Sequence, residues 1–559
     1  MPGGLMQLVS EGQQNIILNG NPSKTFFKTV YAKYTNFGLQ KFRVDFEGSK
    51  TLRLSEPSYF TFKIPRYADL LMDCYLSIDL PNIWSPIIPP NSDSTSPGYN
   101  GGQWIPYEFK WIEYLGAQMI SKIEITCGNQ TLQEFSGAYL AAVVQRDYVA
   151  GKRLLFEKMV GHVPALFDPA SAGTRVNSYP NAYYTTNQAG AEPSIRGRTL
   201  YVPLNAWFNL KSQMAFPLIS LQYNELHVNV TMRPIQELFQ IRDVFDAANN
   251  FPYIAPNFNQ YYMQLYRFLQ TPPDIELGPL SYVDTRAIWN ADIHLNCTYC
   301  FLSNEESRVF ALQEQKYLFK QVKETIYYNV TGSNKISTDS LGMVSNWMFY
   351  FQRSDANLRN EWTNYTNWPY RYIPNDLIQA PTDGTYIIMR DGQQVTVGPG
   401  VNNDGRLTGW MITGLYNFEN IKNILVSMGI LFDGIYRENV QPSGVFNYIE
   451  KYTRTDGNAP DGLYVYNFCL HSSPLDLQPS GAMNMSRFTT IELETTTITP
   501  PLDPFAQSLA ICDPQTGNVI GINKPTWRIY DYNFNMVLFE ERINMITFVG
   551  GNCGLMYAT

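Results

Sequence analysis

Segments in which apolar and polar residues strictly alternate recur along the chain, and they constrain its fold most. In the stretch QKFRVDFEG, Phe42, Val44 and Phe46 point to one side and the charged residues between them to the other. Residues 219–232 repeat this period of two. Because successive side chains of a strand lie on opposite faces of a sheet, such segments are predicted to be half-buried strands.

Further strands are predicted in both halves of the chain. The hairpin at 117–135 turns at Gly128-Asn129, the short turn pair that its alternating flanks require. The 38 Gly and 35 Pro residues favour short strands joined by elaborate loops. The other strand segments are 59–64, 70–80, 199–204, 288–302, 323–330, 346–353, 463–470, 487–498 and 527–541. Helical signals are sparse, which disfavours parallel βαβ folds.

Two helices are predicted among these strands. Ser136 is expected to cap a helix that crosses at 136–149, where apolar residues follow helical spacing. Ser303, with Glu306 three residues later, begins a charged helical segment at 303–322 that we interpret as a connector between two domains. The 559 residues are too many for one core, so two large sandwiches of jelly-roll type are predicted.

Charge and cysteine content limit the classes of function. The net charge of −8 leaves no basic surface that could release counterions from a phosphate backbone, so direct nucleic-acid binding is not expected. Seven Cys residues are few for this length and odd in number, which suits a reducing compartment. The longest apolar stretch, at 424–432, is too short to cross a bilayer. The N-terminus lacks a basic signal-peptide region, so the protein is expected to stay in the cytosol.

The sequence offers no catalytic, cofactor or metal site. Walker, GxGxxG, GxSxG and HExxH motifs are absent, and the four His residues are widely spaced and expected to be core or surface residues: 162, 227, 294 and 471. In CTYC, Cys297 and Cys300 would face opposite sides of a strand and could not readily share a metal or a disulfide. The carboxylate pairs Glu305/Glu306 and Glu540/Glu541 are interpreted as charged surface.

Six N-x-S/T sequons occur, about as many as an Asn- and Thr-rich chain yields by chance. Several fall in predicted strands, where a glycan would not fit. The glycosylation candidates are Asn129, Asn364 and Asn484.

Five blocks, taken together and in order, resemble one known family. The chain contains GGLMQLVSEGQQNIILNGNPSKTFFKTVYAKYTNF, PLISLQYNELHVNV, ADIHLNCTYCFLSNEESRVFALQEQKYLFKQV and LQPSGAMNMSRF, and it ends GGNCGLMYAT. These blocks resemble the major capsid proteins of nucleocytoplasmic large DNA viruses. Asn224 stands where that family usually has His, and large loop insertions depart from its pattern.

The resemblance implies an all-β double jelly roll, that is, two consecutive eight-stranded antiparallel jelly rolls with long loop insertions and a few short helices. It implies an N-terminal arm at 1–26, a first roll at 27–302, a helical linker at 303–315 and a second roll at 316–559. The loops at 81–117, 151–198 and 353–418 would form outward towers.

The implied function is structural, without enzymatic activity or cofactors. Homotrimers of pseudo-hexagonal outline would form the capsomers of the icosahedral shell of a large double-stranded DNA virus. The expected partners are neighbouring capsomers, minor capsid proteins beneath the shell and, through those partners, an inner membrane layer. The expected location is the virion capsid, after synthesis and assembly in the host cytoplasm.

The aromatic residues that precede the first alternating segment need a partner of their own. We expect an arm that packs under the capsomer base, against neighbouring subunits or minor proteins. The alternative is that residues 26–37 form a first strand inside the roll. The arm candidates are Phe26, Phe27, Tyr31, Tyr34 and Phe37.

Two rival functions remain open at this point. Jelly rolls also occur in cupins and glycan lyases, but such sites need His, Glu or aromatic residues that converge on one sheet face, and four scattered His residues disfavour a cupin. A jelly-roll attachment or penton protein, or a carbohydrate-binding protein, is closer in kind. Penton proteins usually have one roll per chain, whereas this length indicates two.

Overall fold

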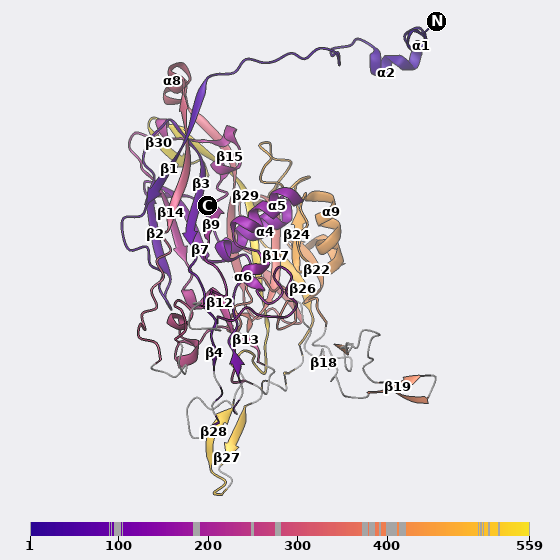
Figure 1. Ribbon diagram of the computed structural model, residues 1–559. Coiled ribbons are helices and arrows are strands. Elements are labelled where there is room, and N and C mark those ends of the chain that lie inside the picture. Colours follow the sequence, from indigo (N-terminus) through magenta and orange to yellow (C-terminus); the bar gives the residue numbers. More distant parts are fainter. Residues whose placement is uncertain are drawn as a thin grey trace.

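The computed structural model describes residues 2–88, 90, 92–93, 102, 104–182, 191–246, 251–273, 281–371, 378–379, 386–390, 393–397, 411–412, 421–500, 502–503, 506, 508–512, 515–523 and 526–557. The strands form two sandwiches that stand side by side along the length of the molecule (Figure 1). Every strand pair in the described residues is antiparallel, which agrees with the expected all-β fold.

The first sandwich is built from the strands between residues 37 and 302. One sheet has the order β1 (Phe37–Asp45), β14 (His294–Leu302), β3 (Leu70–Asp79) and β10 (Phe216–Pro217), with β9 (Thr199–Pro203) also paired to β3. The facing sheet has the order β2 (Ser58–Lys63), β11 (Leu226–Met232), β7 (Ile120–Cys127) and β8 (Gln130–Phe135). Smaller sheets join β13 (Tyr253–Ile254), β12 (Phe239–Arg242) and β6 (Phe109–Trp111), and β4 (Ile87–Ile88) with β5 (Ile105–Pro106).

The second sandwich is built from the strands between residues 315 and 555, and it repeats this plan. One sheet has the order β15 (Gln315–Tyr327), β29 (Phe534–Val549), β17 (Met343–Arg353) and β24 (Leu463–Asn467), with β25 (Met483–Asn484) on β17 and β30 (Asn552–Leu555) on β29. The other has the order β16 (Ser333–Ser337), β26 (Ile491–Thr497), β22 (Leu425–Phe432) and β23 (Ile435–Pro442). Hairpins and short pairs extend from it: β18 (Ile378–Gln379) with β21 (Met411–Ile412), β19 (Tyr386–Arg390) with β20 (Gln393–Val397), and β27 (Leu509–Cys512) with β28 (Val519–Asn523).

The helices are short and lie outside the sheets. They are α1 (Gly3–Val9), α2 (Ile16–Asn19), α3 (Leu115–Gln118), α4 (Gly137–Asp147), α5 (Ala150–Met159), α6 (Pro164–Phe167), α7 (Trp207–Leu210), α8 (Asn304–Leu312) and α9 (Glu450–Arg454). No helix in the described part of the chain is both long and apolar enough to cross a bilayer.

Local patterns predicted the elements of the first sandwich well. The hairpin turns at Gly128-Asn129 with Gly128 at φ 60°, and the Ser136 hydroxyl accepts a hydrogen bond of 3.2 Å from the N–H of Tyr139 at the start of α4. Helices α5 and α6 were not predicted.

Several predicted elements differ from the structure in their bounds; the strand predicted at 527–541, for example, is β29, which extends from Phe534 to Val549. The strand predicted at 219–232 begins only at Leu226, because the N–H groups of Gln222 and Tyr223 donate to the carbonyl of Gly551 instead of to a sheet. The connector helix ends at Leu312 and β15 begins at Gln315, inside the segment interpreted as helical. Ser303 has the extended backbone of an N-cap, but its side chain makes no capping hydrogen bond.

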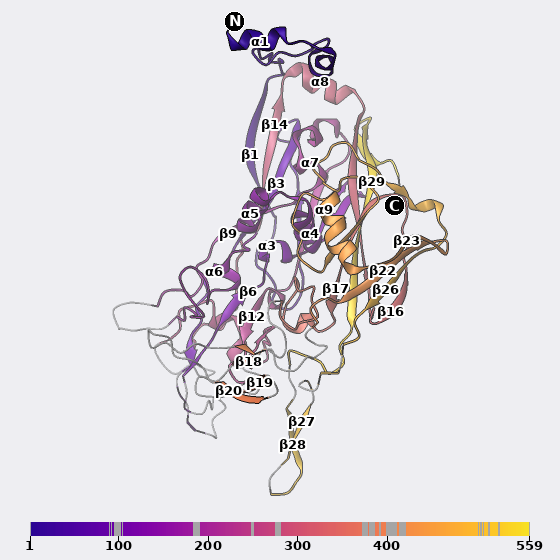
Figure 2. The same ribbon diagram turned by 90° about the vertical axis from the view of Figure 1, so that its right-hand side faces the viewer.

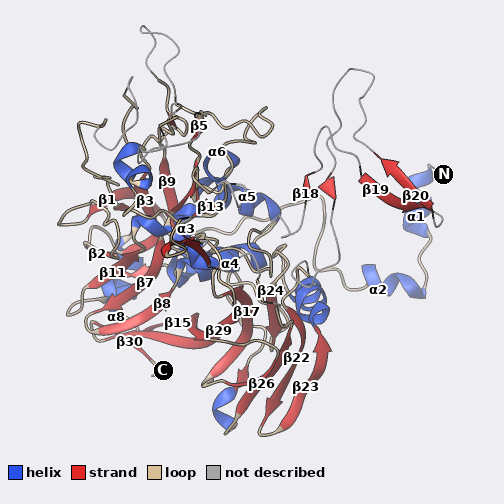
Figure 3. Cartoon of the chain, turned by 90° about the horizontal axis from the view of Figure 1, so that it is seen from below, coloured by secondary structure: helices blue, strands red, loops and turns tan. Residues whose placement is uncertain are grey.

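A single apolar core continues from the first sandwich into the second. The Trp207 ring lies 5.2 Å from Phe319 of β15, and the Phe216 ring lies 5.0 Å from Phe548 of β29. A separate cluster, which includes Trp347, fills the interior of the second sandwich. Seen from below, β15 and β29 lie between β8 and the sheet of β22, β23 and β26 (Figure 3). The two sandwiches therefore bury apolar surface against each other.

Candidate assembly surfaces

Residues 2–36 form an arm that stands away from the body of the protein (Figure 1). Every described residue from 2 to 36 is exposed except Asn15, which is partly buried. No strand includes residues 26–36, so the alternative of a first strand over 26–37 does not match the structure. The first strand, β1, begins at Phe37.

The predicted arm aromatics divide into two groups. Phe26, Phe27, Tyr31 and Tyr34 lie on the arm, and Phe27 is 98% exposed. Phe37, which is 53% exposed, opens β1 opposite Leu302 and is therefore part of the sheet rather than of the arm. The sequence reasoning missed the apolar face of the short helices, where these side chains are also exposed: Leu5, Met6, Leu8, Val9, Ile16, Ile17 and Leu18.

The arm lies at the opposite end of the molecule from three short strand pairs. Helices α1 and α8 are near one end, whereas the strand pairs β18–β21, β19–β20 and β27–β28 are at the other (Figure 2). Large parts of the loop segments 81–117 and 353–418 lie outside the described residues. In 151–198, α5 and α6 lie beside the first sandwich (Figure 1).

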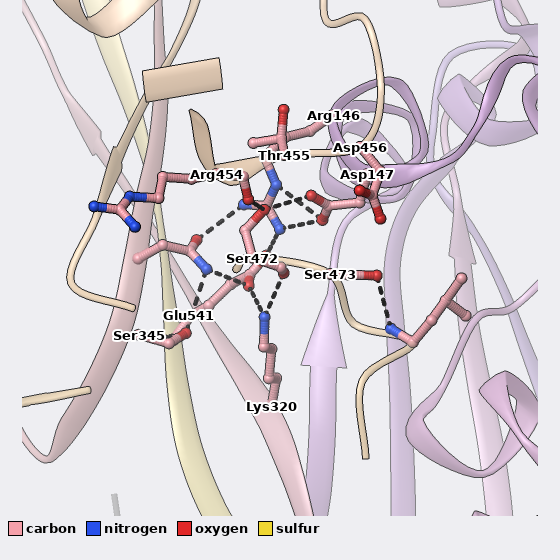
Figure 4. A network of polar contacts seen from close by, with 12 residues as sticks. Arg146, Asp147, Lys320, Ser345, Arg454, Thr455, Asp456, Ser472, Ser473 and Glu541 are labelled. Carbon is pink, nitrogen blue, oxygen red and sulfur yellow. Dashed lines mark hydrogen bonds and ion pairs between the residues drawn. The ribbon is translucent and has the colours of Figure 1, made fainter. Parts of the chain in front are cut away.

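A buried polar network joins the two sandwiches (Figure 4). Arg146, at the end of α4, donates to Asp147 Oδ2 at 2.6 Å and to Glu541 Oε1 at 2.7 Å. Its Nη1 also donates to Asn346 Oδ1 at 2.9 Å. The side chains of Arg146, Asp147 and Glu541 are fully buried. Since α4 belongs to the first sandwich and β29 to the second, this cluster fixes one against the other.

Glu541 is the acceptor at the centre of the network. Its carboxylate accepts from the Tyr139 hydroxyl at 2.9 Å, from Lys320 Nζ at 3.0 Å and from Asn346 Nδ2 at 2.8 Å, in addition to Arg146. Burial alone would raise its pKa, but the charges of Arg146 and Lys320 outweigh burial and hold the pKa at about 2. Glu541 is therefore ionised at neutral pH.

The interpretation of Glu540 and Glu541 as surface carboxylates is wrong. Both are buried, and because they are neighbours on β29 they point to opposite faces of the sheet. Glu540 accepts from Trp347 Nε1 at 2.8 Å inside the second sandwich, whereas Glu541 faces the first. The signal that could have indicated this is EER in the middle of an otherwise apolar strand, NMVLFEERINMITFV.

The histidines do not converge on a site. His162 stacks between two aromatic rings, and burial lowers its pKa. His471 lies between two carboxylates, with Nδ1 2.6 Å from Asp476 and Nε2 3.1 Å from Asp456, and the hydrogen bond with Asp476 raises its pKa. Among the described residues, no group of three or more His, Cys, Asp or Glu side chains could hold a metal ion.

Cys297 and Cys300 lie in β14 and contact different clusters, as their spacing predicted. Cys300 packs with Leu70 and Ala215, whereas Cys297 packs in the main core. The Sγ atom of Cys297 lies 3.3 Å from that of Cys74 on the neighbouring strand, a contact that sequence spacing could not reveal.

The three glycosylation candidates occupy different environments. Asn129 is exposed in the turn between β7 and β8, and Asn484 is exposed in β25. Asn364 is buried, and its side-chain nitrogen donates to the Trp368 carbonyl at 2.9 Å. The prediction for Asn364 is therefore corrected, because the folded chain offers no room for a glycan at this nitrogen.

Two family models match the chain, one to each half. Residues 25–269 match the model described as "Major capsid protein N-terminus", and residues 306–545 match "Large eukaryotic DNA virus major capsid protein". The boundary between the matches includes α8.

Known proteins agree with these matches. The chain is 30% identical to the major capsid protein of Chrysochromulina ericina virus over 60% of this chain and 55% of that protein. It is 25% identical to the major capsid protein of Phaeocystis pouchetii virus over 96% of this chain and 98% of that protein.

A solved structure shares the fold. The chain in the capsid of the virus PBCV-1 superposes with a TM-score of 0.57 at 18% identity, over 96% of this chain and 100% of that one. Its fold is a double jelly roll, and the two sandwiches described above are the same architecture. With the two model matches and the full-length relative, the sequence and the fold lead to one conclusion: the chain belongs to the major capsid proteins of large eukaryotic DNA viruses.

Proposed function

We propose that three copies of the chain form a capsomer of nearly hexagonal outline, and that these capsomers tile an icosahedral shell. The observation that carries this proposal is the repeated plan of the two sandwiches, each with a pair of facing sheets that have four strands in their main path. Three chains with two similar sandwiches each present six similar walls, so a threefold particle can pack in a hexagonal lattice.

The domain division proposed for this role follows the strands. The first roll includes β1 to β14, the linker is centred on α8, and the second roll extends from β15 to β30. The order of the strands supports the proposed boundaries at 27–302, 303–315 and 316–559, although the first strand begins only at Phe37.

The arm is proposed to pack beneath the capsomer, against neighbouring subunits or minor capsid proteins. Its support is the exposed apolar surface of residues 2–36, which is more than a chain of this kind leaves in water without a partner. We infer that the loop end with β27–β28 then faces outward. Any contact with an inner membrane layer would pass through the minor proteins.

The first experiment is native mass measurement of the recombinant protein. A particle of about three times 63.9 kDa is expected. A protein that stays monomeric at all concentrations would contradict the capsomer proposal.

The second experiment tests the arm. A variant that lacks residues 1–25 should form trimers but no shells, and so should a full-length variant with Ser in place of Phe26, Phe27, Tyr31 and Tyr34. The matched control is Tyr59→Ser, since Tyr59 is an exposed aromatic residue of β2. Normal particles from both arm variants, seen by electron microscopy, would refute the proposal, and loss of trimers would place the arm inside the capsomer instead.

We also propose where the protein is assembled and which of its residues are glycosylated. Synthesis and assembly in the host cytoplasm is supported by the seven cysteines, which are all free thiols in the structure. Glycans are proposed at Asn129 and Asn484 because both residues are exposed. Peptide mass spectrometry of purified particles tests the glycans, and unmodified peptides that contain both sequons would exclude them.

A further inference from the structure

A cavity lies where the two sandwiches meet. Its wall includes buried aromatic and aliphatic side chains from both of them, among them Tyr139 and Leu140 of α4, Trp207 of α7 and Phe319 of β15. The volume of the cavity is about 70 Å³. A space for one water molecule needs roughly 10 to 15 Å³, so the cavity has room for an alkyl chain of several carbons.

The loop at 471–481 closes one side of the cavity. The N–H of His471 donates to Ser480 Oγ at 2.9 Å, and this hydroxyl donates to the carbonyl of His471 at 2.9 Å, so the two ends of the loop are joined. Leu475 lines the cavity from the loop and packs against the main core. Because the loop belongs to no helix or strand, it can open locally while the sheets stay folded.

Two polar side chains of the wall are placed to bind a ligand oxygen. Asn205 and Lys211 flank the single turn of α7, and both line the cavity. The side-chain nitrogen of Asn205 is buried, and no described residue accepts a hydrogen bond from it. A buried donor without a partner costs free energy, which an acceptor on a ligand would offset. Lys211 is exposed, so its ammonium lies where the cavity meets solvent.

The charges along the wall favour an anion beside Lys211. Lys320 Nζ lies 3.0 Å from a carboxylate oxygen of Glu541, and His471 Nδ1 lies 2.6 Å from one of Asp476, so both of these cationic groups already have a partner. Asp476 is the acidic residue of the wall, and His471 holds it. The ammonium of Lys211 has no ionic partner among the described residues.

We propose that this cavity binds a medium-chain fatty acid, with the alkyl chain between the sandwiches and the carboxylate at Lys211 and Asn205. The apolar wall removes the chain from water, and the two donors satisfy the carboxylate oxygens. Because the wall is built from both sandwiches, the bound chain adds apolar contacts between them. The inference concerns a single chain and holds whether or not the chain forms trimers.

The test uses octanoate as the probe and the full-length protein. Isothermal titration calorimetry should show binding at one site per chain, and the midpoint of thermal unfolding should rise with the octanoate concentration. Octanol has the chain without the charge and acetate has the charge without the chain, so each should bind at least about tenfold more weakly. A lack of octanoate binding at millimolar concentrations would overturn the proposal, and so would octanol that binds as tightly as octanoate.

Three variants sharpen the test. Leu210→Phe adds volume at a half-buried position of the wall and should prevent binding. Lys211→Gln removes the charge at an exposed position, where the fold is not disturbed, and should weaken octanoate binding about tenfold without a change for octanol. The matched control is Lys158→Gln, an exposed lysine of α5 outside the cavity, which should bind octanoate as the wild type does.

The comparison between the two lysine variants decides the outcome even if Leu210→Phe does not fold. Octanoate affinity that is unchanged in Lys211→Gln, or lowered equally in Lys158→Gln, would overturn the proposal. Octanoate that binds a folded Leu210→Phe protein as tightly as the wild type would show that the ligand lies elsewhere on the surface, and it would overturn the proposal too.

Discussion

Replacement of Arg146 by Met tests whether the buried network holds the two sandwiches together. Met keeps most of the volume of the side chain but removes its charge. Asp147 would then lose both of its bonds from Arg146 and keep the Ser472 hydroxyl at 2.6 Å, whereas Glu541 would keep Tyr139, Lys320 and Asn346. Asp147 is therefore the carboxylate that loses the larger share of its hydrogen bonds.

The expected loss in the free energy of unfolding follows from the hydrogen bonds that Asp147 and Glu541 lose and keep. Removing one partner of a buried ion pair typically costs about 3 to 5 kcal/mol, because a buried charge is left uncompensated. We expect a loss in this range rather than above it, since one of the two carboxylates keeps a cation. In the double variant Arg146→Met with Asp147→Asn, no unpaired charge remains at Asp147, so the loss should be smaller than the sum of the two single losses by about 1 to 3 kcal/mol.

Urea unfolding, followed by tryptophan fluorescence, measures these losses. Lys122→Met is the matched control. Lys122 forms an ion pair with Glu134 at 2.8 Å, but their side chains are 48% and 52% exposed, so this pair should contribute less than about 1 kcal/mol. If Arg146→Met costs no more than Lys122→Met, the network does not stabilise the contact between the sandwiches.

Three further predictions concern stability. The pKa of Glu541 is held at about 2, below its ordinary value of 4.5, so the unfolded chain binds more protons than the folded chain between these two pH values. The urea midpoint of unfolding should therefore fall as the pH drops from about 4.5 to about 2. Glu541→Gln should make the midpoint less dependent on pH in this range. A Cβ on Gly457 would lie 2.5 Å from two carbonyl oxygens at the end of α4, so Gly457→Ala should cost about 2 kcal/mol in urea unfolding, whereas Gly151→Ala, with no atom within 4 Å, should cost nothing. Phe62→Ala should cost about 3 to 5 kcal/mol because the ring is fully buried, and Tyr59→Ala on the exposed face of the same strand should change stability by less than about 0.5 kcal/mol in the same assay.

Local sequence patterns could predict the strands but not their long-range contacts. The alternation around Phe42 and the turn at Gly128 depend on a few neighbouring residues, and both are found in the structure. The start of β15 was missed because Lys316 and Lys320 gave the segment a charged, helix-like composition. In the fold, β15 pairs with β29 along its whole length, and Lys320 reaches Glu541.

The network and the thiol pair could not be predicted for a related reason. Arg146 and Glu541 are 395 residues apart, and no pattern within a strand or helix brings them together. Cys74 and Cys297 likewise meet only after β3 and β14 have paired. The arm was easier to recognise, because its aromatic residues precede any alternation, although only the structure separates Phe37 from it.

The shared core has a consequence for closed shells. Aromatic rings from both sandwiches pack within one cluster, and a buried ionised network joins α4 to β29. A change in the angle between the sandwiches would therefore cost much free energy. The curvature of a shell built from such chains must then arise at the contacts between neighbouring chains. Each chain would behave as a rigid body. The contacts between chains would differ between flat facets and bent edges of the shell through segments such as the arm, which is not packed in a core.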